Sequence, residues 1–473
     1  MTMETAVRSA ACAPSSEQAS LAAQVRGPVL LPGLDDYDTE RRGFNTLLDH
    51  RPRVIVGATG TQDVVAAVRF ATARGLPVGV QATGHGPAVS ADDAVLISTR
   101  RMTGLRVDPR RRTARIEAGV CWEQVIHEAA AFGLAPLNGS SPLVGAVSYT
   151  LGGGLGVMAR TFGYAADHVR GIDVVTADGV PRQLDTEHEP DLFWALRGGK
   201  GNFGVVTSIE LGLVPVTRLY GGTLSFAGES APEVLRWWLM WTADVPEEMN
   251  SSIALVRLPD DPGIREELRG RFLTQIRIAF TGPADQGESL VAPLRGLAPR
   301  VLDTVAEMPY TDVASIHADP TRPYSYHERT TMLRGVDQHA IDALLAVAGP
   351  GTDCRLGLVE LRHLGGALRR APAEGNAVGN READFCLLTV APGGPRMGRR
   401  EADDLLLEQM SPWSTGGRYL NFLDASATPD QVRAAYSPDA YARLAELKAE
   451  YDPGNVFRLN HNIPPSRRRA VAR

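Results

Sequence analysis

A histidine stands inside a glycine-rich turn early in the chain. The segment Gln81–Gly86 follows an apolar run and contains His85, and a second glycine-rich segment, Leu151–Gly156, follows further along. Glycine has no Cβ, so backbone N–H groups in such turns can approach an anionic ligand closely. A neutral imidazole nitrogen is also a nucleophile. The two segments therefore predict an anion-binding site, and the histidine inside the first turn suggests a role beyond phosphate binding.

Short elements must position these turns between residues 50 and 215. Capping residues and apolar periodicity predict one helix from Thr61, with Asp63 in its first turn, and another over Trp122–Phe132. Strands are expected over Val54–Val56, Val78–Val80, Val95–Ser98, Ala114–Glu117, Ile172–Thr176 and Val205–Leu211. This mixture is typical of an α+β unit.

The pattern changes beyond about residue 218. Helices are predicted over Ala231–Thr242, Asp285–Leu297 and Asp337–Val347, and strands over Gln275–Phe280, Leu356–Leu361 and Phe385–Val390. They indicate a second domain, an antiparallel sheet with helices on one side. In the last 60 or so residues we expect a strand over Tyr419–Leu423 and helices over Pro429–Tyr436 and Pro438–Tyr451.

Composition excludes several classes of partner. The 473 residues carry 49 basic and 55 acidic side chains, a net charge of −6, which disfavours a nucleic-acid or membrane surface. No apolar run approaches a membrane span, and residues 1–25 lack signal-peptide features and are expected to form a flexible tail. The four cysteines are too far apart for a disulfide framework or a metal site. We expect a cytoplasmic protein, a monomer or homodimer, with no metal.

The order of these motifs resembles the FAD-binding domain of the vanillyl-alcohol oxidase and p-cresol methylhydroxylase type. Within that superfamily it is similar to the berberine-bridge-enzyme-like FAD-linked oxidases, most specifically over Pro190–Gly199 and Tyr451–Ile463. The resemblance implies an α+β protein of two domains. Residues 26–218 and 411–473 would form a split FAD-binding domain, and residues 219–410 a substrate domain with an antiparallel sheet flanked by helices.

The resemblance also implies which residues bind FAD. In the family, the histidine at the position of His85 is bonded to the flavin 8α-methyl carbon. The further positions that match are Gln81, Ala82, Thr83, Gly84, Gly86, Ser141, Val144, Gly145, Ser148, Gly152, Gly153, Gly154, Gly156, Val174, Gly199, Asn202, Gly204, Val205, Val206, Asn460 and Asn462.

Two of these positions carry finer expectations. Many relatives have a cysteine bonded to flavin C6 where Ser141 stands, and a hydroxyl cannot form that bond. A single covalent bond, through His85, is therefore expected. Val144 matches a position beside the flavin where a small side chain goes with oxidase behaviour, so dioxygen is the expected electron acceptor.

The catalytic base departs from the family pattern. Relatives often carry Tyr-x-Asn-Tyr, and Phe422 stands where the second tyrosine would act. Strand alternation would put Tyr419 and Asn421 on one face, away from Phe422. Tyr419, Asn421 and, in the substrate domain, Glu360 are the catalytic candidates. Further possible bases or partners are Arg362, His363, Tyr324, Tyr326 and His327.

The function that the resemblance implies is an FAD-dependent oxidase. A hydride would pass from a small organic substrate to FAD, and dioxygen would reoxidise the flavin and yield hydrogen peroxide. The substrate would be an alcohol, a glycoside or a secondary-metabolite intermediate, or an amine as in 6-hydroxynicotine oxidase. Phe422 keeps open a redox-neutral cyclase or isomerase, and a flavin carrier without turnover is a third hypothesis.

Overall fold

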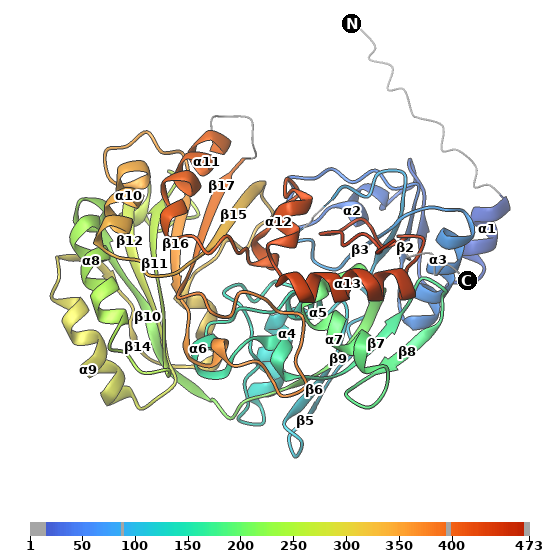
Figure 1. Ribbon diagram of the computed structural model, residues 1–473, viewed down its shortest axis with the longest axis horizontal. Helices are drawn as coiled ribbons and strands as arrows, with labels where there is room; N and C mark the ends of the chain where they lie inside the picture. Colours follow the sequence, from blue (N-terminus) through green and yellow to red (C-terminus); the bar gives the residue numbers. More distant parts are fainter. Residues whose placement is uncertain (1–15, 87–88, 394–398, 468–473) are drawn as a thin grey trace, which may run out of the picture.

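Three sheets organise the chain in the computed structural model, which describes residues 16–86, 89–393 and 399–467. Two smaller sheets contain the strands before residue 213, and one large sheet contains those from 218 to 392. Figure 1 shows the large sheet on one side of the molecule and the two smaller sheets on the other. The predicted α+β class, with an antiparallel sheet flanked by helices, is confirmed.

The first sheet carries the turn with His85 at the end of a strand. Its strand order is β1 (Val29–Leu30), β2 (Val54–Gly57), β4 (Val95–Ser98) and β3 (Val78–Gln81). Both β2 and β3 pair with β4 in parallel, and parallel neighbours need a crossover connection. Helix α3 (Thr61–Ala73) provides the connection from β2 to β3 and buries Val64 and Val68. The short helix α2 (Tyr37–Arg41) lies beside β2 and β4.

The expected flexible tail over residues 1–25 is wrong in part. Residues Ser16–Ala22 form helix α1, whose Leu21 is only 1% exposed and packs in the same core as Val64. Burial of this leucine stabilises the helix against the domain. Residues 1–15 lie outside the described part of the chain.

The second sheet is antiparallel and lies in the same half of the molecule. Its order is β5 (Leu105–Asp108), β6 (Thr113–Glu117), β9 (Val205–Gly212), β7 (Val169–Val175) and β8 (Pro181–Leu184). Helices pack on it, among them α4 (Trp122–Ala130), α5 (Ala146–Leu151) and α7 (Pro190–Gly199). The C-terminal helices α12 (Pro429–Arg433) and α13 (Pro438–Tyr451) bury Val432 and Leu444 in this core. The chain end thus returns to the half of the molecule in which it began (Figure 1).

The large sheet has eight strands with helices on one face. The strands are β10 (Arg218–Ala227), β11 (Met249–Arg257), β12 (Phe272–Phe280), β13 (Arg300–Asp303), β14 (Ala306–Pro309), β15 (Tyr326–Leu333), β16 (Leu358–His363) and β17 (Phe385–Pro392). The helices are α8 (Ala231–Thr242), α9 (Ala284–Arg295), α10 (Gln338–Ala348) and α11 (Arg399–Gln409). They cover the face that points away from the smaller sheets (Figure 1).

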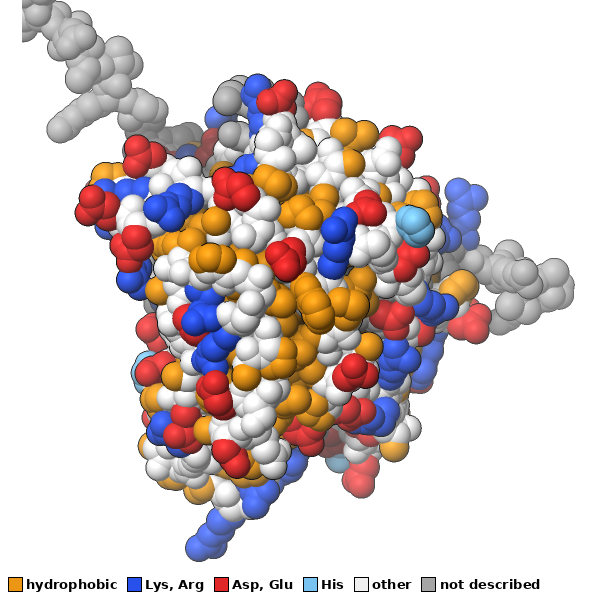
Figure 2. All heavy atoms as spheres, turned by 90° about the vertical axis from the view of Figure 1, so that its left-hand side faces the viewer, with side chains coloured by type: hydrophobic (Ala, Val, Ile, Leu, Met, Phe, Trp, Pro, Cys, Tyr) orange, Lys and Arg blue, Asp and Glu red, His pale blue; other side chains and the backbone are white. Residues whose placement is uncertain are grey.

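Helices α8 and α11 also present apolar side chains to solvent. Trp237, Met240 and Leu405 are 50%, 54% and 47% exposed. Figure 2 shows this side of the molecule, where hydrophobic side chains lie among charged ones. No helix in the described residues is long and apolar enough to cross a membrane.

The predicted strand over Tyr419–Leu423 is wrong. Residues Leu420–Phe422 form a 3-10 turn, η8, in which Phe422 donates its backbone N–H to the Tyr419 carbonyl at 3.0 Å. The Tyr419 hydroxyl accepts a hydrogen bond from the Leu155 N–H at 2.7 Å. This long-range contact holds the segment against the second glycine-rich segment and overrides the local strand preference.

Candidate functional site

The turn around His85 is held by close packing. Gly84 has a φ of +71°, and a Cβ there would lie 2.4 Å from the Gly43 Cα, so only glycine fits. The His85 ring stacks on Phe44 with centroids 3.9 Å apart, and Nδ1 lies 2.8 Å from Thr83 Oγ1. Its Nε2 is buried and has no hydrogen-bond partner within the described residues. Burial lowers the pKa of His85 to about 4, so the ring is neutral near pH 7.

Strand β15 of the large sheet reaches this turn. The Tyr326 hydroxyl donates a hydrogen bond to the His85 carbonyl at 2.7 Å, and the Tyr326 ring stacks on Tyr324. Burial raises the pKa of both tyrosines well above the usual range, so both stay protonated. The raised pKa values argue against either tyrosine as the catalytic base.

Thr83 also connects the first glycine-rich turn to the start of helix α5, which leads into the second glycine-rich segment. Its Oγ1 accepts a hydrogen bond from the Gly145 N–H at 3.2 Å, at the start of helix α5. Ser148 is exposed on that helix, and Val144 just before it is half-buried. Ser141 is 9% exposed, and its Oγ accepts only a long bond from the Leu143 N–H.

The second glycine-rich segment comes close to the C-terminal part of the chain. Gly153 and Gly154 have φ values of +111° and +79°. A Cβ at Gly152 would lie 2.0 Å from Asn421 Oδ1 and 2.7 Å from Lys200 Cε. Glycine is therefore required here by conformation and by space.

Not every predicted cofactor residue faces open space. Val174, Val205 and Val206 are at most 5% exposed in the core of the second sheet, and a Cβ at Gly204 would lie 2.7 Å from Val174 Cγ2. Gln81 directs its amide to the carbonyls of residues 40–42, and Gly156 packs on the Asn138 carbonyl. Beside Gly86, by contrast, a Cβ would meet no atom of the described residues within 4 Å.

The C-terminal segment carries acceptors that meet no donor. Asn202 uses its amide nitrogen on the Gly199 and His461 carbonyls and its oxygen on the Ile463 N–H, so it anchors this segment. The Oδ1 atoms of Asn460 and Asn462 are buried and lack partners within the described residues. The two asparagines, unlike Asn202, are therefore free to bind a polar ring.

Tyr419 and Asn421 are bonded to each other and to the second glycine-rich segment. Asn421 Nδ2 donates to the Tyr149 carbonyl at 2.9 Å and to the Tyr419 hydroxyl at 3.3 Å. Burial raises the pKa of Tyr419 well above its usual range. A phenol that already accepts two hydrogen bonds and resists ionisation is a poor general base. The structure therefore favours a positioning role for this pair.

Glu360 is occupied by cations. It is fully buried on β16, where it accepts hydrogen bonds from Ser252 Oγ (2.7 Å), Arg277 Nη1 (2.7 Å) and Arg362 Nε (2.8 Å). Burial opposes its ionisation, but Arg362 and Arg277 hold the pKa of Glu360 well below its usual range. Such a carboxylate accepts protons weakly, so the structure argues against Glu360 as the base.

Sequence reasoning missed a second carboxyl on the same sheet face. Glu328 lies on β15 between Tyr326, which bonds to His85, and Met332, which packs with Leu155 and Tyr419. Within the described residues it forms no ion pair. Burial raises the pKa of Glu328 to about 8, and Asp424 adds to the shift. Side chains two residues apart in a strand lie on the same face, so the candidate Tyr326 could have pointed to Glu328.

The remaining candidate bases, His327 and His363, bond to groups outside the proposed site. His327 points to the opposite face of the sheet, where Nε2 lies 2.5 Å from Asp403 Oδ2 on α11. His363 contacts Arg160, which lies in the short helix α6 (Ala159–Phe162). No group of three or more potential metal ligands gathers anywhere in residues 16–86, 89–393 or 399–467.

The chain matches two known families. The one described as FAD binding domain matches residues 52–185, and the one described as berberine and berberine like matches residues 418–464. The (R)-6-hydroxynicotine oxidase of Paenarthrobacter nicotinovorans is 31% identical over 459 residues, which are 93% of this chain and 97% of that protein.

Solved structures give the same picture. The 6-hydroxy-D-nicotine oxidase of Arthrobacter nicotinovorans superposes with a TM-score of 0.80 at 26% identity and covers 93% of this chain and 98% of its own. Glucooligosaccharide oxidase of Acremonium strictum, described with a 6-S-cysteinyl, 8α-N1-histidyl FAD, has a TM-score of 0.82 at 20% identity, covers 96% and 100%, and shows the fold alone. The prediction of an FAD-dependent oxidase is confirmed, and the redox-neutral alternative is not favoured.

Proposed function

Because this chain belongs to the berberine-bridge-enzyme-like family of FAD-linked oxidoreductases, we propose that it holds FAD by one covalent bond through His85. The observation that supports the bond is the ring itself: neutral, fixed by Phe44 and Thr83, with Nε2 buried and without a partner in the described residues. Ser141, in place of a cysteine, supports a single bond. Dioxygen is the proposed electron acceptor, with Val144 as the small side chain beside the flavin.

Several atoms of the site fit a polar ring and a diphosphate. An unpaired buried polar atom costs about 1–3 kcal/mol, and His85 Nε2, Asn460 Oδ1 and Asn462 Oδ1 are such atoms within the described residues. The left-handed backbone at Gly153 and Gly154, and the lack of close contacts at Gly86 among the described residues, suit phosphate groups bound by N–H donors. When bound there, FAD would supply the hydride-accepting and oxygen-reactive chemistry, while the residues of the chain would hold and orient it.

Glu328 is the proton acceptor that we propose for this reaction. A base must lie near the substrate and titrate near the working pH. Glu328 faces the smaller sheets from β15, and its raised pKa of about 8 meets the second condition. Tyr419 and Asn421 then hold the second glycine-rich segment in place, and Glu360 orients Arg277 and Arg362.

For the substrate we propose a chemical class, and for the protein a cellular compartment and an oligomeric state. The relatives named above act on a nicotine derivative and on glucooligosaccharides by their names, which supports an amine, an alcohol or a glycoside, or an intermediate of secondary metabolism. Cys121, Cys354 and Cys386 are unpaired within the described residues, which supports a reduced, cytoplasmic setting. A monomer or homodimer remains the proposed assembly.

Acid precipitation of the purified protein tests the covalent bond. We expect a yellow pellet from the wild type and a colourless pellet from His85→Ala, whose flavin would stay in the supernatant. His188→Ala is the matched control, because His188 is exposed and bonds only to Asp185 within the described residues. A yellow pellet from His85→Ala would refute the bond.

Val144→Leu tests the oxygen position. After anaerobic reduction, the variant should reoxidise in air more slowly than the wild type, as followed by flavin absorbance. An unchanged reoxidation rate would remove Val144 from the path of oxygen.

A further inference from the structure

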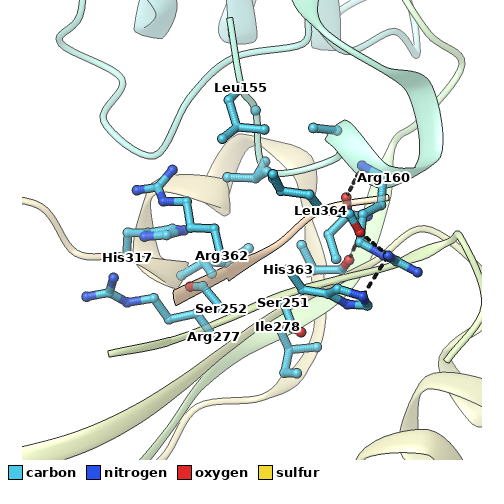
Figure 3. A pocket seen from close by; sticks show the side chains of 16 residues that line it. Leu155, Arg160, Ser251, Ser252, Arg277, Ile278, His317, Arg362, His363 and Leu364 are labelled. Atoms are coloured by element: carbon cyan, nitrogen blue, oxygen red, sulfur yellow. Dashed lines mark hydrogen bonds between the residues drawn. The ribbon is translucent and has the colours of Figure 1, made fainter. Parts of the chain in front are cut away.

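A small cavity lies between helix α6 and the polar face of the large sheet. Its volume is ≈ 40 Å³, and its lining includes Leu155, Ser252, Arg277, His317 and Arg362. Figure 3 shows Arg277, His317 and Arg362 gathered on one side of it, with Leu155 above them. One buried water needs about 10–15 Å³, so the space suits a group of a few atoms.

The charge of this lining is not balanced. Arg277 and Arg362 share one carboxylate, that of Glu360, and the three side chains are 6%, 15% and 1% exposed. Arg160 adds a third buried cation and has no carboxylate within 4.0 Å in the described residues, since its nitrogens bond to carbonyls and to His363. The half-buried Asp319 acts on Arg362 only from a distance. Buried cations in excess favour a bound anion.

Donors on the cavity side also lack partners. Arg277 Nε and His317 Nδ1 are buried without a hydrogen bond among the described residues, and His317 Nδ1, which donates in one tautomer of the neutral ring, lies 3.8 Å from Glu360 Oε1. Arg362 uses Nε for Glu360, and its two terminal nitrogens make no hydrogen bond in the same set. Burial, with Arg277 nearby, lowers the pKa of His317 to about 3, so the positive charge comes from the arginines alone. Guanidinium groups bind oxyanions with charge-assisted hydrogen bonds.

The cavity adjoins the proposed reaction site. The Arg362 guanidinium lies over the Phe422 ring at 5.0 Å, and Phe422 contacts Tyr419, which bonds to Leu155. Arg362 also acts electrostatically on Glu328. A substrate that reaches Glu328 could therefore place a second group in the cavity.

We propose that Arg277, Arg362 and His317 form a subsite for an oxyanion, and that the substrate of this oxidase carries a carboxylate there. The substrate part rests on the proposed function, while the binding of an anion does not. A neutral sugar or a neutral amine would leave the positive charge of the two arginines balanced only by the Glu360 carboxylate. An acid with an oxidisable C–H bond would satisfy both the charge and the free donors.

Calorimetric titration of the holoenzyme with benzoate and with benzamide tests the subsite. The two probes have nearly the same shape and differ in charge. We expect the wild type to bind benzoate at least about tenfold more tightly than benzamide. In Arg277→Gln the ratio should fall to near one, whereas Arg277→Lys should keep part of it. A ratio near one in the wild type would overturn the proposal without any variant.

Arg218→Gln is the matched control. Arg218 begins β10 of the same sheet, is 51% exposed and pairs only with Glu307 in the described residues, so the ratio should not change. A preference for benzoate that survives Arg277→Gln, or is lost equally in Arg218→Gln, would overturn the subsite.

Two further results separate the possible sources of the anion. Sulfate that displaces benzoate but binds more weakly supports a substrate carboxylate. Sulfate that binds at least as tightly as benzoate indicates a free inorganic anion and overturns the substrate part. The colour of the acid-precipitated pellet is independent of these affinities, so failure of the flavin bond and failure of the subsite are distinguishable.

Discussion

The two faces of the large sheet are built from the same strands and bury opposite kinds of side chain. On the helix-covered face, Ile253 and Leu361 pack with Trp238 of α8. On the face toward the smaller sheets, their chain neighbours Ser252 and Glu360 are joined by a hydrogen bond of 2.7 Å. Period-two alternation sends neighbours to opposite faces, so a single residue step separates a hydrophobic core from a charged site.

The difference between the faces separates stability from function. The apolar face contributes free energy through burial of hydrocarbon. Buried ion pairs contribute little net stability, because desolvation offsets their attraction. Arg277, Glu360 and Arg362 are therefore explained better by binding and catalysis than by folding. Loss of the proposed base on the polar face should mainly change activity, and truncation on the apolar face should mainly change unfolding. Side chains that bond to the buried Glu360 carboxylate, such as Ser252, also contribute to stability.

Glu328→Gln should have the largest effect, and it should be an effect on activity. Loss of a general base lowers kcat by about 10²–10⁴-fold, while the half-buried site retains its shape. Peroxide production and urea unfolding measure the two quantities. Full activity in the variant would show that Glu328 is not the base. A large loss of stability would break the division between the faces.

Trp238→Ala should have the next largest effect, on the other face. Trp238 is 0% exposed and packs 5.8 Å from the Phe385 ring. Truncation of such a side chain lowers the free energy of unfolding by about 3–5 kcal/mol. Trp237→Ala is the control: the Trp237 side chain is 50% exposed, so its truncation should lower the free energy of unfolding by less than about 1 kcal/mol. Equal losses in both variants would contradict the assignment of faces.

Ser251 and Ser252 are neighbours on β11 and point to opposite faces of the sheet, so they allow the two faces to be compared directly. Ser252 donates to the Glu360 carboxylate at 2.7 Å, while Ser251 accepts a weak bond from Trp238 Nε1 at 3.3 Å. Removal of a hydrogen bond to a charged group costs about 1.5–3 kcal/mol, and of a neutral one about 0.5–1.5 kcal/mol. Denaturant unfolding of Ser252→Ala and Ser251→Ala should therefore rank them in that order. The reverse order would show that the charged cluster is loosely held.

The pH profile carries the smallest expected effect. Glu328 must be ionised to accept a proton, and its pKa is raised to about 8. Below pH 8, kcat/KM should therefore fall about tenfold per unit, and above pH 8 it should level off. Glu328→Gln should have a flat profile over this range. If kcat/KM of the variant still fell below pH 8, the titration would belong to another group.

The sequence predicted the structure correctly where that structure depends on residues that are neighbours in the chain. The predicted helix over Ala231–Thr242 has those bounds, and Asp337 caps helix α10 by accepting a hydrogen bond from the Ala340 N–H. The left-handed backbone at Gly84, beside His85, favours glycine locally, and the close approach of Gly43 adds a requirement that comes from the tertiary structure. By contrast, the strand expected at Tyr419 was wrong, because the bond from Leu155 comes from 264 residues away.

The sequence by itself determined the α+β class, the two glycine-rich segments and the position of His85, because backbone geometry and apolar periodicity are properties of consecutive residues. Only the tertiary structure shows that the pKa of Glu360 is lowered while that of Glu328 is raised. Glu360 receives Arg277 from 83 residues away and is held ionised, whereas Glu328 receives no such partner within the described residues. A pKa depends on burial and on the charges that folding brings near, and neither can be read from a strand's own residues.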